Sequence, residues 1–120
     1  MSPKPDRGTK PLTSSSFYIL FALADGEQHG LGIAAEIAER TGGDVELGPG
    51  TLYTAIQKME NAGLIKETTG TNSGGKEDSR RRYYGITPAG RRALEAEAKR
   101  LARIVDAAYE KLLIDRKRPA

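Results

Sequence analysis

Cysteine and tryptophan are both absent from this chain of 120 residues. Without thiols, the protein cannot form a disulfide, a thiolate nucleophile, a cysteine zinc site or a thiol redox sensor. The single histidine, His29, has neither a cysteine nor a spaced pair of carboxylates near it in the sequence. It is therefore better interpreted as a turn residue before a helix than as a general base or metal ligand. These shortages predict a protein that is not an enzyme and that holds no metal or other cofactor.

Long apolar runs are also missing. No stretch approaches the roughly 18 apolar residues of a membrane span, and residues 1–11 carry prolines and charges where a signal peptide needs an apolar stretch. We therefore expect a cytoplasmic protein with no membrane partner. The length fits one domain, and the mean hydropathy of -0.53 is that of a soluble chain whose small core would benefit from a partner subunit.

The first half of the chain predicts two helices of different character. The first begins at Thr13 or Ser14 and is apolar on nearly every side from residue 17 to residue 24, which predicts burial all round. A domain this small could hardly cover such a helix alone. The second has apolar residues on one face between residues 31 and 38 and ends at a pair of glycines. Residues 45–47, which follow, are long enough only for a short strand.

A third helix is predicted from Gly48 and Pro49 to Gly63, because proline is favoured at the first helical position. Its apolar residues recur at helical spacing and form an inward face. The residues that must then point outward, here called the outer face, are Thr51, Thr54, Gln57, Lys58 and Asn61. Short hydroxyls, amides and a lysine suit contact with DNA bases and phosphates better than contact with water alone.

Two strands, 64–68 and 82–86, are predicted on either side of a polar, glycine-rich stretch, and together they form a hairpin with a long basic loop. Lys76, Arg80, Arg81 and Arg82 are the candidates for phosphate contacts. Side chains alternate along a regular strand, so the three consecutive arginines cannot all face DNA. Lys76 and one or two of the arginines are the better candidates.

A last helix is predicted from Pro88 to about Leu113, capped by Thr87. At about 1.5 Å per residue it would be on the order of 39 Å long, too long for so small a domain to cover. Its apolar residues alternate spacings of four and three, which is typical of helices that pack side by side. We expect it to form a dimer interface together with Phe17 and Phe21 of the first helix. Its contributing residues are Leu94, Ala98, Leu101, Val105, Ala108 and Leu112. Packing within its own chain is the less favoured alternative.

The predicted fold is therefore mainly α with a small antiparallel β wing, that is, a winged helix-turn-helix followed by a long C-terminal dimerisation helix. The expected organisation is a flexible arm (1–12), the DNA-binding domain (13–87), the dimerisation helix (88–113) and a basic tail (114–120). In this fold the third helix enters the major groove and the wing follows the phosphate backbone.

Four short motifs in this order resemble the PadR family of transcriptional regulators. They are Gly48-Pro49-Gly50-Thr51-Leu52-Tyr53, Gly63-Leu64-Ile65, Arg80-Arg81-Arg82-Tyr83-Tyr84 and Ile86-Thr87-Pro88-Ala89-Gly90. The resemblance implies a dimer formed through the first and last helices. It also implies that Tyr53 contacts DNA, although the helical position of Tyr53 is equally consistent with a half-buried ring that holds the helix. Gly50 leaves an open approach near a helix N-terminus, where phosphates bind readily.

The predicted function is that of a regulator that binds double-stranded DNA sequence-specifically, as a homodimer on a twofold-symmetric operator. Members of the family that it resembles usually repress transcription, so the resemblance implies a repressor. One alternative is a winged helix that binds another protein, but the polar outer face lacks the aromatic and apolar anchors of protein interfaces. Another is a regulator gated by a small hydrophobic effector at the dimer interface, although Phe17, Phe21 and Tyr109 are as easily core residues.

Overall fold

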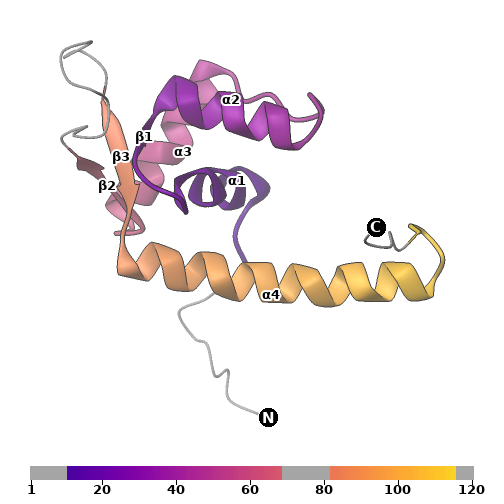
Figure 1. Cartoon of the computed structure of the whole chain (residues 1–120). Helices are drawn as coiled ribbons and strands as arrows, with labels where there is room; N and C mark the ends of the chain where they lie inside the picture. The colour runs from indigo at the N-terminus through magenta and orange to yellow at the C-terminus, as the bar shows by residue number, and fades with distance from the viewer. Residues whose placement is uncertain (1–10, 69–81, 116–120) are drawn as a thin grey trace.

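Four helices and three strands make up the part of the chain that the computed structural model describes, residues 11–68 and 82–115 (Figure 1). In chain order they are α1 (Ser14–Leu23), β1 (Gln28–His29), α2 (Gly30–Arg40), α3 (Pro49–Asn61), β2 (Ile65–Thr68), β3 (Tyr83–Ile86) and α4 (Pro88–Glu110). This arrangement confirms the predicted fold class, including the long C-terminal helix.

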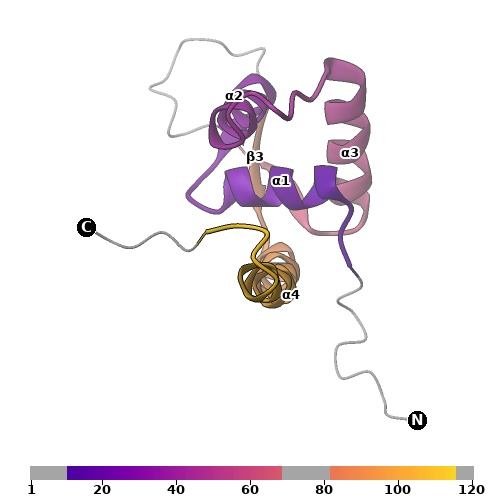
Figure 2. The same cartoon turned by 90° about the vertical axis from the view of Figure 1, so that its right-hand side faces the viewer.

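Helix α1 lies at the centre of the molecule and contacts α2, α3 and α4 (Figure 2). Ile19, Leu20 and Leu23 are fully buried there, which explains why the helix has apolar residues on nearly every side. The prediction that one chain could hardly cover this helix is largely wrong, because the other three helices surround it. Only one edge stays open, where Phe21 is 38% exposed beside the half-buried Phe17.

The helix ends follow local signals in the sequence. The Thr13 hydroxyl accepts a hydrogen bond from the Ser16 N–H at 3.1 Å and so caps α1. Pro49 is the first residue of α3, as predicted, with Gly48 at the N-cap position. At the other end of α3, Gly63 has a φ of +79°, a conformation that glycine adopts without strain.

The sheet is antiparallel with the strand order β1-β3-β2. Strands β2 and β3 lie within one residue of their predicted bounds, but the short strand expected at residues 45–47 is wrong. Both edges of β3 are already paired, one with β2 and one with the two residues of β1. Val45 and Leu47 pack against the core from a loop instead, and this alternating burial imitates the pattern of a strand.

Helix α4 runs beneath the rest of the molecule and extends beyond it (Figure 1). Its first three turns bury Gly90, Ala93, Leu94 and Glu97 against α1 and β3. It ends at Glu110, not at about Leu113 as predicted, and Leu112 adopts a φ of +63° outside the helix. None of the helices in the described ranges is both long and apolar enough to cross a membrane.

Candidate nucleic-acid interface

The outer face of α3 is exposed along its whole length. All five residues that define it are exposed, and so is Gly50, whereas Leu52, Ile56 and Met59 on the opposite face are buried in the core. The only carboxylate of α3 is that of Glu60, which is half-buried and lies outside the outer face. A row of hydroxyl, amide and ammonium groups is therefore presented without an acidic neighbour on the same helix face.

Tyr53 also projects from α3, and it is 44% exposed. Its ring lies over Gly30, the first residue of α2, so closely that a methyl group on Gly30 would overlap the phenol oxygen. The side chain thus joins α3 to the N-terminus of α2 while keeping much of its surface open. Both interpretations of Tyr53 from the sequence are compatible with this position.

The base of the wing is formed by β2 and β3. Arg82, just before β3, is exposed and has its Nε 4.0 Å from a carboxylate oxygen of Glu67 on β2. Such an exposed ion pair contributes little stability, so the guanidinium group could exchange Glu67 for a phosphate at small cost. Lys76, Arg80 and Arg81 lie outside the described residues.

Strand β1 fastens this wing base to the N-terminus of α2. His29 pairs with Tyr83 of β3, and the two rings meet edge to face with centroids 5.3 Å apart. The His29 Nδ1 accepts a hydrogen bond from the Gly32 N–H at 3.1 Å and caps α2. The sequence had suggested a turn residue for His29, but its two-residue strand is too short to leave a pattern.

Thr87 connects α3, the wing and α4 at one point. Its hydroxyl donates to the Gly63 carbonyl at 2.6 Å and accepts from the Gly90 N–H at 3.0 Å, while its own N–H donates to the Leu64 carbonyl at 3.1 Å. The cap on α4 was predicted, but the link to the end of α3 was not. It fixes the direction of α4 relative to α3.

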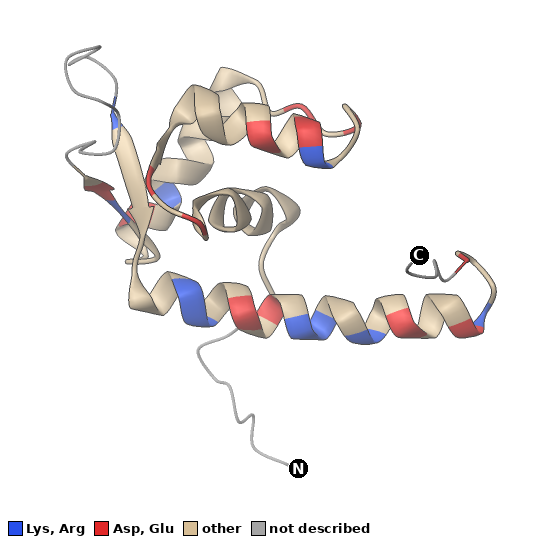
Figure 3. Ribbon diagram, in the orientation of Figure 1, with Lys and Arg blue, Asp and Glu red and all other residues tan. Residues whose placement is uncertain are grey.

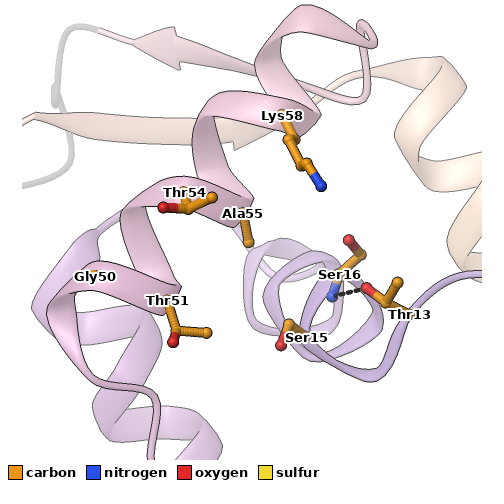
Figure 4. Close-up of a pocket in the computed structure, with 8 residues that line it drawn as sticks. All are labelled: Thr13, Ser15, Ser16, Gly50, Thr51, Thr54, Ala55 and Lys58. Carbon is orange, nitrogen blue, oxygen red and sulfur yellow. Dashed lines mark hydrogen bonds between the residues drawn. The ribbon is translucent and has the colours of Figure 1, made fainter.

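Beside the outer face, a cleft of about 640 Å³ separates α3 from the first turn of α1 (Figure 4). The residues that line it are Thr13, Ser15, Ser16, Gly50, Thr51, Thr54, Ala55 and Lys58. The contribution of α1 was not predicted, because Ser15 and Ser16 are more than 30 positions away from α3 in the chain.

The six dimer residues predicted on the last helix fall into three groups. Leu94 is 7% exposed and belongs to the core of its own chain, so the prediction that a partner subunit covers it is wrong. Leu112 is 87% exposed but lies beyond the end of α4, so it does not continue the apolar pattern of the helix. Ala98, Leu101 and Val105 are exposed on α4, and Ala108 is half-buried. Ile104, which was not among the predicted dimer residues, is 65% exposed.

Charge along α4 is mixed, with lysine and arginine alternating with acidic residues, whereas α1 carries no charged residue (Figure 3). Only one of these acidic residues, Glu97, is buried. Its carboxylate accepts hydrogen bonds from the Leu12 N–H at 3.1 Å and from Arg100 at 2.9 Å. Burial raises the pKa of Glu97, but the hydrogen bonds from Arg100 and Leu12 outweigh it and hold the pKa below its ordinary value.

Comparison with known proteins gives a consistent family. Residues 19–96 match the model of the transcriptional regulator PadR-like family. The chain is 33% identical over 84 residues to the transcriptional regulator Rv3488 of Mycobacterium tuberculosis. This match covers 70% of this chain and 72% of that protein. It is also 38% identical over 97 residues to an uncharacterised 37.1 kDa protein in transposon TN4556 of Streptomyces fradiae. That match covers 81% of this chain but spans only 26% of the relative's length.

Two solved structures of transcription regulators have a fold similar to that of this chain. A PadR family transcription regulator from Clostridium difficile R20291 superposes with a TM-score of 0.70 at 27% identity, over 83% of this chain and 99% of that one. Bacillus subtilis PadR, solved in complex with operator DNA, shares the fold with a TM-score of 0.57 at 19% identity, over 91% of this chain and 52% of that one.

Proposed function

The chain belongs to the PadR-like family of transcriptional regulators, and from this membership we propose that it is a cytoplasmic, homodimeric repressor that binds a twofold-symmetric operator. Members of the family are DNA-binding regulators and not enzymes. Membership also favours DNA over the alternative of a winged helix that binds only other proteins.

The observation that carries the proposal is the exposed outer face of α3 beside the wing base. Gln57 and Asn61 present amides one helical turn apart, and an amide can bond two edge groups of adenine in the major groove. Arg82 stands at the root of the neighbouring hairpin, where a wing would follow the phosphate backbone. This division supports α3 as the recognition helix and the wing as an anchor.

The second half of α4 supports the dimer. Leu101, Ile104 and Val105 are exposed apolar residues on a helix that extends beyond the core of its own chain (Figure 1). Exposed apolar surface of this kind on a soluble protein marks an interaction site. A second copy, related by a twofold axis, would cover it symmetrically and present two recognition helices to half-sites about 10 base pairs apart, or a multiple of that.

Repression would follow if the operator overlaps a promoter, because the bound dimer would then obstruct the polymerase. A small hydrophobic effector at the dimer interface stays a prediction. The exposed edge of Phe21, stacked on Phe17 with ring centroids 6.3 Å apart, would give such a molecule an aromatic wall.

Selection of bound fragments from a random DNA pool by the purified 120-residue chain tests the proposal. We expect enrichment of one inverted repeat with the half-site spacing given above. A variant with Gln57→Ala and Asn61→Ala should retain its fold and dimer but enrich no repeat. Failure of the wild-type chain to enrich any sequence, or enrichment of a motif without a dyad, would contradict the proposal.

A further inference from the structure

We propose that the cleft between α1 and α3 binds one phosphodiester group of the operator, which makes α1 a second anchor for DNA. Lys58 would supply the charge, and the hydroxyls of Ser15 and Ser16 would donate hydrogen bonds to the phosphate oxygens. The inference rests on the proposed function and names α1 as a contributor to the same interface.

The geometry of the cleft places these groups opposite one another. The Lys58 side chain extends from α3 across the cleft toward the first turn of α1, where Thr13 and Ser16 lie (Figure 4). The cleft is continuous with the outer face, because Thr51, Thr54 and Lys58 belong to both. A duplex whose major groove holds α3 therefore brings one of its backbone strands to the mouth of this cleft.

The chemistry of the lining selects an anion. None of the eight lining residues is acidic, five carry a hydroxyl group, and Lys58 is the only charged residue. Within the described part of the chain, no carboxylate forms an ion pair with Lys58, and the Ser15 and Ser16 hydroxyls have no hydrogen-bond partner. The Thr13 hydroxyl is different, because it accepts from the Ser16 N–H and belongs to the helix cap.

The size and openness of the cleft favour a group on a polymer over a free ion. About 640 Å³ exceeds the needs of a single phosphate and leaves space for the sugars on either side of it. Ser15 and Ser16 are only half-buried, so a backbone strand can reach them from solvent. Contacts of this kind position the protein on the duplex and carry no sequence information.

A charge reversal at Ser16 tests the inference without endangering the fold. Ser16 is the third residue of α1, and Thr13 is its N-cap, so Ser16→Glu completes a capping box and should maintain or raise the melting temperature. The same carboxylate would repel a phosphate in the cleft. We expect Ser16→Glu to weaken binding to the selected operator by about tenfold or more, and binding to a scrambled duplex by the same factor.

The matched control is Ser14→Glu, which adds the same charge to the same helical turn at an exposed residue that does not line the cleft. Its effect on affinity should be several times smaller. Lys58→Gln should also weaken both duplexes alike and lower the salt slope of binding by about one ion, whereas Lys99→Gln on α4 should leave the slope unchanged.

Neutral methylphosphonates placed singly along the operator locate the contact. A methylphosphonate at one position should weaken binding of the wild-type protein but should not further weaken binding of the Lys58→Gln variant. Equal affinity of Ser14→Glu and Ser16→Glu, or a Lys58→Gln variant that weakens only the operator, would overturn the inference while operator binding by the wild type still upheld the proposed function.

Inorganic phosphate distinguishes a free anion from the DNA backbone. When phosphate replaces chloride at equal ionic strength, we expect no rise in the melting temperature of the free protein. A rise that Ser16→Glu abolishes would assign the cleft to a free ion and overturn the role given to DNA. If the wild type bound no duplex at all, the proposed function itself would fail.

Discussion

The phenol group of Tyr53 on α3 lies directly against Gly30, the first residue of α2, in a space that a Cβ atom would fill. The glycine therefore sets how closely α3 approaches the start of α2. The obstructing atoms belong to the far end of a half-exposed side chain, which can swing into solvent. A larger residue at position 30 should thus move Tyr53 without unfolding the protein.

Gly30→Ala should consequently cost less than about 1 kcal/mol of unfolding free energy, because the ring yields and alanine is the better helix former. It should nevertheless weaken operator binding by displacing Tyr53. Urea unfolding and titration of a labelled duplex measure the two quantities separately. In a Tyr53→Ala background, Gly30→Ala should no longer change the affinity, and an undiminished loss there would show that Tyr53 does not mediate the effect.

Gly90→Ala should behave differently, because the obstructing atom is the backbone carbonyl oxygen of Leu64. The first turn of α4 would have to move away from the start of β2, which should cost about 1 to 3 kcal/mol or more. Urea unfolding checks this value. Gly50→Ala is the control, since open space surrounds that position, and it should be neutral or stabilising.

The sequence predicted those features that depend on neighbouring residues. Thr13, Pro49 and Thr87 mark the starts of α1, α3 and α4, because caps and first-turn prolines act within a few residues. The outer face of α3 followed from helical periodicity alone, and all its residues are exposed.

Features that depend on distant segments were missed. Strand β1 exists because β3 offers its free edge to Gln28 and His29, and nothing in two residues reveals a partner more than 50 positions away. Leu94 fits the apolar pattern of α4 as well as Leu101 does, but only the packing of α1 decides which of them the chain itself covers. The cleft between α1 and α3 was not predicted for the same reason, because its two walls come from distant segments of the chain.

The exposed part of α4 predicts that the proposed dimer can be dissociated without loss of the fold. Leu101→Glu combined with Val105→Glu should give a folded monomer in sedimentation equilibrium, because neither side chain belongs to the core of its own chain. The affinity of this variant for the operator should also fall, because it no longer dimerises. Leu94→Ala should instead lower the free energy of unfolding by about 2 to 5 kcal/mol, because Leu94 belongs to the core of its own chain. A well-folded wild-type monomer at micromolar concentration would refute the proposed dimer.

Glu97 should make stability depend on pH. Its pKa is lowered in the folded protein, so its contribution is complete above the unfolded value of about 4.3 and is lost as the pH falls through the folded value. Glu97→Gln should cost up to about 1.5 to 3 kcal/mol at neutral pH, and this difference should shrink toward pH 3. Thermal unfolding from pH 7 to pH 3 measures it. The matched control is Glu95→Gln, which removes the same charge from an exposed residue of the same helix.

We predict that Gln57 reads the base sequence and that Lys76, which lies between β2 and β3 in the sequence, contacts the phosphate backbone. Gln57→Ala removes an amide from the outer face of α3 and should cost on the order of 1 to 3 kcal/mol on the selected operator while leaving a scrambled duplex nearly unaffected. Lys76→Ala should weaken both duplexes alike and lower the salt slope by about one ion, because phosphates carry no sequence information. Titration of both duplexes at several salt concentrations separates the two effects. An equal loss on both duplexes for Gln57→Ala, or a changed preferred sequence for Lys76→Ala, would reverse the assignment of α3 to bases and the wing to phosphates.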